Sequence, residues 1–143
     1  MRISDILRHK GAEVATVRTD ASVGDLLARL SVLNVGALVV SDDDETVAGI
    51  VSERDVVRRL HVEGAGLLHH RVRDIMTADV ATCEPTEAVD DLMRLMTERR
   101  IRHVPVLVQG RLAGLVSIGD VVNHRVGELE EERHQLESYI SGS

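Results

Sequence analysis

The sequence predicts a mixed α/β (α+β) fold built from two tandem β-α-β-β-α repeats and a C-terminal helix. Three observations lead to this prediction. The chain repeats itself, each copy alternates β-rich segments with helical periodicity, and the 143 residues are enough for only one ordinary domain. Because one copy alone is too short to bury its sheet well, we expect the two copies to pack together about a pseudo-twofold axis.

The repeat is clearest in a glycine-to-valine segment that occurs twice. Residues 49–57 (GIVSERDVV) match residues 114–122 (GLVSIGDVV) at six of nine positions. Weaker matches lie upstream in both copies, and their spacing changes only where loops are expected. We therefore predict four regions, which are a first repeat over 1–62, a linker over 63–70, a second repeat over 71–126 and a C-terminal helical extension over 127–143.

Each copy shows the same order of elements. Short apolar segments at 14–17 and 80–83 predict a first strand, and apolar residues at helical spacing predict a helix after it. Ser22 and Thr86 are the expected N-caps of these helices. Two β-rich runs joined by turn residues then follow, at 37–40 and 47–51 in one copy and at 104–108 and 112–116 in the other. A second helix begins at Ser52 or Ser117.

Composition excludes several classes of partner. The net charge of −7 comes without a cluster of Lys and Arg, which argues against nucleic acid and against an anionic membrane surface. Tyr139 is the only Phe, Tyr or Trp, so no aromatic platform for stacked bases can form. The sequence has no long apolar run or signal peptide, and its single Cys83 fits a reducing compartment. We therefore expect a cytoplasmic protein without nucleic-acid or membrane partners.

With these repeats the chain resembles the CBS-domain family, in which two repeats form a pair called a Bateman module. The resemblance is carried by Asp74-Ile75-Met76-Thr77, by the HVPV segment at 103–106, and by Gly-aliphatic-aliphatic-Ser-x-x-Asp in both copies. It extends to about residue 126 and indicates a stand-alone pair. The resemblance implies clefts between the repeats that bind AMP, ADP, ATP, NAD or S-adenosylmethionine. Each cleft takes its Ser-x-x-Asp from one repeat and its first two strands from the other.

The resemblance also implies that the two clefts differ. In the first, the helix start of one repeat faces strands of the other, through Ser52, Arg54, Asp55, Asp79, Ala81, Ile101, Arg102, His103 and Pro105. In the second, the corresponding residues are Ser117, Ile118, Gly119 and Asp120 with Glu13, Ala15, Val35, Gly36 and Ala37. Because Arg54, Arg102 and His103 are replaced there by Gly119, Gly36 and Ala37, we expect the first cleft to bind the more highly charged ligand.

These residue types suit a nucleotide. An aspartate such as Asp55 or Asp120 can accept hydrogen bonds from both vicinal hydroxyls of ribose. A helix start at Ser52 or Ser117 offers free amides to phosphate, and arginine binds phosphate bidentately. The same Ser-x-x-Asp pattern also forms a capping box that needs no ligand. A ligand-independent dimerisation or protein-interaction scaffold is therefore the alternative.

We accordingly expect a regulatory nucleotide sensor and not an enzyme. The sequence has no P-loop, no dinucleotide-binding glycine motif and no set of acid, base and nucleophile. The expected ligand is AMP, ADP, ATP or NAD in a regulatory role, without a catalytic cofactor. We expect no metal site, because His69-His70 and the acidic segment 42–45 lack ligand spacing, and we expect Cys83 to be a core residue. The expected partners are a second copy, joined through helices that include the stripe from Val126 to Ile140, and a regulated protein that the sequence does not name.

Overall fold

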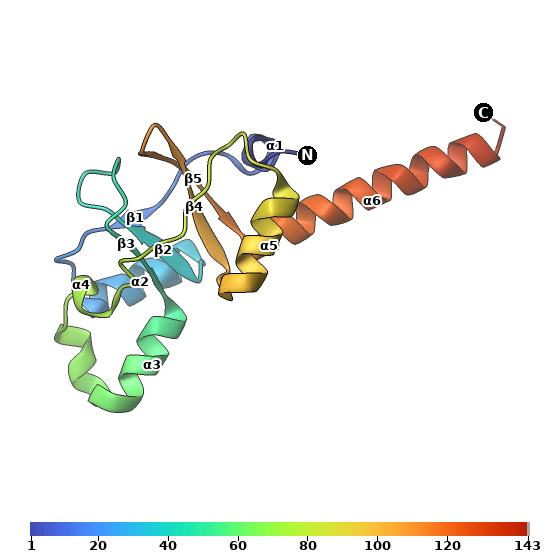
Figure 1. Cartoon of the computed structure of the whole chain (residues 1–143). Coiled ribbons are helices and arrows are strands. Elements are labelled where there is room, and N and C mark those ends of the chain that lie inside the picture. Colours follow the sequence, from blue (N-terminus) through green and yellow to red (C-terminus); the bar gives the residue numbers. More distant parts are fainter. Residues whose placement is uncertain (143) are drawn as a thin grey trace.

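Two small sheets, one in each repeat, form the framework of the molecule (Figure 1). The structure is a computed structural model and describes residues 1–142. In the first sheet, β1 (Thr16–Val17) lies parallel to β2 (Ala37–Val40), which lies antiparallel to β3 (Gly49–Ser52). In the second sheet, β4 (His103–Val108) and β5 (Arg111–Ser117) are antiparallel. The predicted mixed α/β class is confirmed.

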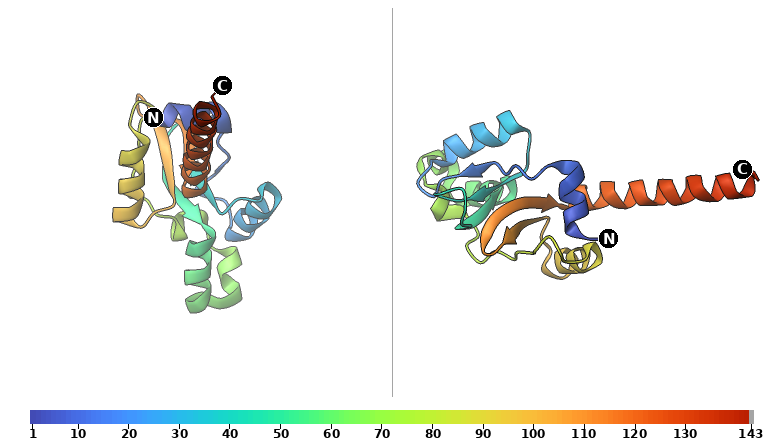
Figure 2. Two further views of the ribbon diagram at one scale, coloured as in Figure 1. Left: turned by 90° about the vertical axis from the view of Figure 1, so that its right-hand side faces the viewer. Right: turned by 90° about the horizontal axis from the view of Figure 1, so that it is seen from above.

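Helices surround these sheets in the predicted order, with additions at the start of each repeat. The helices are α1 (Ile3–Lys10), α2 (Val23–Leu33), α3 (Glu53–Glu63), a 3-10 helix η1 (Gly64–His69), α4 (Val72–Ile75), α5 (Val89–Arg99) and α6 (Ile118–Ile140). The two further views show that the C-terminal part of α6 extends away from the body as a single rod (Figure 2).

The caps explain where most helices begin. The Ser22 hydroxyl accepts a hydrogen bond from the amide of Asp25, as expected for an N-cap. Ser52 and Ser117 form capping boxes with the aspartates three residues later. The prediction of Thr86 as an N-cap is wrong, because α5 starts after Ala88. There the amide of Val89 donates to the carbonyl of Met1 at 3.0 Å, so another chain segment replaces the capping side chain.

The strand predicted over 80–83 is reduced to a single bridge between Cys83 and Val106. The Cys83 amide donates to the Pro105 carbonyl at 3.0 Å, and the Leu107 amide donates to the Cys83 carbonyl at 2.8 Å. Extending this parallel ladder toward Ala81 would require an N–H group at Pro105, which proline lacks. The proline in the HVPV segment therefore shortens the strand beside it.

The two repeats exchange their first helices. Ile3 and Ile6 of α1 are buried in the core of the second repeat, and Val72 and Ile75 of α4 are buried in the core of the first. The exchange is symmetric, since Arg2 pairs with Ala88 just as Arg71 pairs with Ser22. The expected packing of the two copies is thus an exchange of core residues, which makes each repeat depend on the other.

The segment expected as a polar linker over 63–70 is instead helical and packed. α3 continues to Glu63, η1 follows directly, and Leu67 has no exposed surface. Leu67 lies in the core of the first repeat together with Val72 of α4. The connection therefore completes the first core and holds α4 in place.

The expected C-terminal extension is a continuation of α6, which runs unbroken through the predicted boundary at 126/127. Its apolar stripe is largely solvent-exposed, with Val126 46%, Leu129 48%, Leu136 61% and Ile140 80% exposed. Within the chain, this stripe is thus left available for another surface.

Two glycines allow close crossings between the repeats. A Cβ atom on Gly49 would lie 2.6 Å from the carbonyl oxygen of Thr77, whereas one on Gly114 would lie 2.7 Å from a methyl carbon of Leu7. The Thr77 carbonyl is fixed by a hydrogen bond from the Ile50 amide, but the Leu7 side chain can rotate away. We expect Gly49→Ala to lower the free energy of unfolding by about 1–3 kcal/mol and Gly114→Ala to lower it less. Urea unfolding of both variants measures this, and a larger loss at Gly114 would contradict it.

Candidate functional site

Residues of both repeats line one small cleft of about 270 Å³. Arg54 comes from the first turn of α3, whereas Arg100 and Arg102 follow the C-terminal end of α5. The remaining lining residues are Met96, Thr97, Ile101 and Ile118, so the described lining contains no carboxylate. We call this site the arginine cleft.

The three guanidinium groups of the arginine cleft are not neutralised by the protein. Within residues 1–142, the side chains of Arg54, Arg100 and Arg102 make no hydrogen bond and no ion pair. Most other arginines of the chain are paired, for example Arg59 with Glu63 at 2.9 Å. Unpaired guanidinium groups that share a cleft form a site for an anion with several oxygens, such as phosphate.

The arginine cleft brings together part of the predicted first site. It contains Arg54, Ile101 and Arg102, and also Ile118 from the predicted second site. The other residues predicted for the first site lie outside its lining, namely Ser52, Asp55, Asp79, Ala81, His103 and Pro105. Sequence reasoning missed Met96, Thr97 and Arg100. The available signal for Arg100 was its position just before the Ile101-Arg102 segment.

Within the part of the chain that the structure describes, Asp55 of the first Ser-x-x-Asp motif has no cationic partner. Its Oδ2 atom accepts hydrogen bonds from the Ser52 amide at 2.9 Å and from the Ser52 hydroxyl at 3.1 Å. The described residues give no hydrogen bond to its Oδ1 atom. One carboxylate oxygen of Asp55 is therefore available to a hydroxyl of a ligand.

Asp120 of the second motif is already paired. The Lys10 ammonium group donates to its Oδ2 atom at 2.5 Å and to the Leu115 carbonyl at 2.6 Å, and the Ser117 amide also donates to Asp120. Burial opposes ionisation of this carboxyl, but these hydrogen bonds hold its pKa below the ordinary value. The comparison of the two repeats in the sequence predicted no cationic side chain at this site. Lys10 supplies one because α1 packs on the second repeat.

His103 lies beside the second motif, since it pairs with Ser117 in the sheet. Burial lowers the pKa of His103 below its ordinary value, and the nearby Lys10 charge acts in the same direction. Its imidazole is therefore neutral at pH 7. On the sequence alone, His103 is grouped with Arg54 and Arg102 as a source of positive charge. The positive charge of the arginine cleft comes from its arginines.

Neither the arginine cleft nor the cavity beside α6 brings the residues predicted for the second site together. Ala37 pairs with Ser52 in its own sheet, and the Gly36 carbonyl accepts a hydrogen bond from the Glu53 amide at 2.9 Å. Ala15 packs against the first core, while Glu13 and Val35 are exposed. Asp120 instead lines a larger cavity of about 640 Å³ between α1 and α6, where none of the other residues predicted for this site is found.

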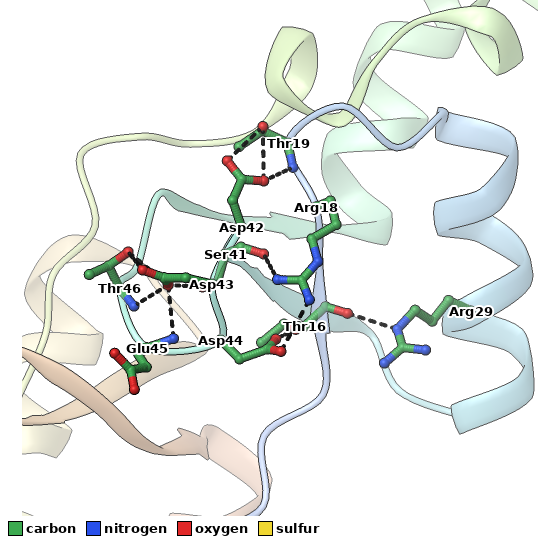
Figure 3. A network of polar contacts seen from close by, with 10 residues as sticks. All are labelled: Thr16, Arg18, Thr19, Arg29, Ser41, Asp42, Asp43, Asp44, Glu45 and Thr46. Atoms are coloured by element: carbon green, nitrogen blue, oxygen red, sulfur yellow. Dashed lines mark hydrogen bonds and ion pairs between the residues drawn. The ribbon is translucent and has the colours of Figure 1, made fainter.

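The three aspartates in the acidic loop after β2 accept hydrogen bonds from the loop itself and from the segment around β1 (Figure 3). Asp43 accepts hydrogen bonds from the amides of Thr46 and Glu45, which hold its pKa far below the ordinary value. Asp42 accepts from Thr19, and Asp44 accepts from Thr16 and Arg18. Within residues 1–142, no group of three or more His, Cys, Asp or Glu is arranged to hold a metal ion.

Cys83 is a core residue, as expected from the sequence. It is buried in the second core, and burial raises the pKa of its thiol to about 12, so the thiolate that a nucleophile needs does not form at neutral pH. Across residues 1–142, no helix has both the length and the apolar character to cross a bilayer.

Several known proteins are similar to this chain in sequence and in fold. The chain is 40% identical over 148 residues to the CBS domain-containing protein CBSX3, mitochondrial, of Arabidopsis thaliana, which covers 98% of this chain and 72% of that one. It spans only 35% and 37% of two other curated relatives. The crystal structure of a CBS-domain containing protein from Agrobacterium tumefaciens is 44% identical with a TM-score of 0.84, covering 87% of this chain and 99% of that one.

A more distant structure shares the fold at 24% identity and a TM-score of 0.76, covering 86% of this chain and 98% of that one. It is the CBS domain pair of protein MJ0100 in complex with 5′-methylthioadenosine and S-adenosyl-L-methionine. The model of the CBS domain itself matches this chain twice, over residues 3–62 and 72–127. Together with the two repeats and their exchanged helices, these matches show that the chain belongs to the CBS domain family as a tandem pair.

Proposed function

We propose that this CBS pair is a regulatory module that binds an adenine nucleotide, with the phosphates of the ligand in the arginine cleft. The observation that carries the proposal is the meeting of three unpaired guanidinium groups from two repeats around one cleft without carboxylates. Phosphate matches such a set of groups, because each guanidinium can donate two parallel hydrogen bonds to it and its several oxygens can serve more than one arginine.

The size of the cleft fits part of a nucleotide. A volume of about 270 Å³ is just below the usual range of pockets that enclose a whole ligand. We therefore propose that the nucleoside lies beside the cleft. There Asp55 would accept the ribose hydroxyls, and Asp79, Ala81, His103 and Pro105 of the second repeat would lie along the nucleoside. The complex of the MJ0100 pair with two adenosine-containing ligands supports this ligand class.

Ligand occupancy would be transmitted by a change in how the two repeats pack against each other. A ligand that contacts both repeats can shift the arrangement of the pair only by its difference in affinity for two states. The arginine cleft joins α3 of the first repeat to α5, to the segment after α5 and to the start of α6 in the second, so binding there would draw these elements together. Such a movement would change the surface that a regulated partner or a second copy contacts.

A second copy of the chain is the partner that the exposed surface favours. Large apolar side chains are exposed on several helices, including Val32 at 85%, Val62 at 78% and Ile140 at 80%. Exposed apolar side chains in such number are typical of proteins that bury part of their surface against a partner. A ligand-independent dimerisation scaffold is the second candidate function, since this surface would serve it equally well.

Thermal melting with adenosine, AMP, ATP and NAD separates the two functions. A nucleotide at one hundred times its dissociation constant should stabilise the protein by about 2.7 kcal/mol, whereas a scaffold would melt at the same temperature with and without each ligand. Analytical ultracentrifugation of the same samples gives the oligomeric state. A monomer whose melting temperature no adenine ligand changes would contradict both functions.

A further inference from the structure

We propose that Arg100 makes the arginine cleft select nucleotides with two or more phosphates over monophosphates. The inference rests on the proposed function, which it extends by naming the ligand class of the cleft. Neither the repeated motifs nor the predicted site included this residue. The argument depends on its backbone, its neighbours and its counterpart in the first repeat.

Arg100 is in an uncommon conformation for its residue type. It is the C-cap of α5, with φ 55° and ψ 43°, in the left-handed region. The C-cap of α2 has nearly the same conformation, φ 54° and ψ 49°, but there the residue is Asn34. Asparagine is enriched in this region and long side chains are not. At this position the second repeat has Arg100, whereas the first repeat has Asn34, which is better suited to the left-handed conformation.

The cap itself does not require an arginine. The Arg100 amide donates to the Met96 carbonyl, and the Ile101 amide donates to the same carbonyl at 3.1 Å. These are backbone interactions, which asparagine would make equally well, as the Asn34 amide does at the end of α2. Within the described residues, the Arg100 side chain has no partner in the protein. Strain of this kind is typical of functional positions.

The number of cations in the cleft indicates the ligand class. Arg54 and Arg102 together carry two positive charges, which match the charge of about −2 on a single phosphate at neutral pH. Arg100 adds a third charge to a lining without carboxylates. A second phosphate group provides further oxygens for this guanidinium, whereas a monophosphate leaves it without an anionic partner. The first repeat has Asn34 and Gly36 in the matching positions, so the feature is confined to this cleft.

The test is calorimetric titration of the wild type and of Arg100→Asn, which restores the residue found at the first-repeat cap. We expect the variant to lose at least tenfold in affinity for ATP and for inorganic tripolyphosphate, and less than threefold for AMP and adenosine. Arg99→Asn is the matched control, because Arg99 is an exposed neighbour outside the cleft lining and should leave all four affinities unchanged. The midpoint of urea unfolding should not fall in Arg100→Asn, since asparagine suits the left-handed backbone.

The outcomes separate the two proposals. If the wild type binds tripolyphosphate but no adenine ligand, the proposed function fails while the role of Arg100 is still decided by the loss of tripolyphosphate binding in the variant. If the wild type binds ATP and Arg100→Asn loses ATP and AMP equally, or neither, the inference about Arg100 is wrong and the function stands. If the wild type binds AMP but neither ATP nor tripolyphosphate, the inference about Arg100 is wrong and the function stands. If it binds none of the four ligands, both proposals are wrong.

Discussion

Replacing Leu67 with alanine should lower the free energy of unfolding by about 2–5 kcal/mol. Leu67 has no exposed surface and packs in the core of the first repeat, although it lies in the short connection between the repeats. Truncation would leave a cavity beneath η1 and loosen α4, whose Val72 and Ile75 belong to the same core. Urea unfolding followed by circular dichroism measures the loss.

The neighbouring residue provides the control for this experiment. Leu68 has the same chemistry and lies in the same 3-10 helix, but it is 43% exposed. Leu68→Ala should therefore change the free energy of unfolding much less than Leu67→Ala. Equal effects of the two substitutions would mean that Leu67 does not stabilise the core of the first repeat.

Replacing Asp55 with alanine should weaken nucleotide binding by about 1.5–3 kcal/mol, which is roughly a 10- to 150-fold loss of affinity. Asp55 keeps one carboxylate oxygen without a hydrogen bond from the described residues, and it lies one residue from Arg54 of the arginine cleft. Asp120→Ala should cost less affinity, because the Lys10 ammonium group already neutralises that carboxylate through its Oδ2 atom, whereas Asp55 has no such ion pair. Isothermal titration with ATP compares the two variants.

Both substitutions also remove half of a capping box, which makes them a matched pair. The two variants should therefore lose similar amounts of cap stability, and the titrations are done at a temperature where both are folded. A difference in affinity then reports on the ligand and not on the helix start. Equal losses of affinity would show that the two motifs contribute alike.

Local features of this fold could be predicted from the sequence. The internal repeat gave the order of elements, and the Ser-x-x-Asp spacing gave two of the helix starts with their capping boxes. The helix starts depend on residues within four positions of each other, and the element order depends on local periodicity that occurs twice. A pattern in one chain is enough to identify them, because the same backbone geometry is required wherever they occur.

Most of the features that sequence reasoning missed depend on contacts between distant segments. The start of α5 is satisfied by the Met1 carbonyl, not by Thr86, and Lys10 reaches Asp120 across 110 positions of sequence. The strand at 80–83 is short because its neighbour presents a proline. Arg100 belongs to the candidate site through a backbone conformation that no motif encodes. None of these can be read from hydrophobic periodicity.

The exchange of α1 and α4 has a consequence for how such a chain could be divided. A polypeptide containing only one repeat would carry a first helix that fits another copy's core and would lack the helix for its own. It could become complete only by domain swapping with a second molecule, so its folding would depend on concentration. The short packed segment at η1 joins the two halves and makes the exchange intramolecular. Each first helix is then held at a high effective concentration near its core, so folding no longer depends on protein concentration. The tandem pair therefore has the packing of a domain-swapped dimer whose two halves are covalently linked.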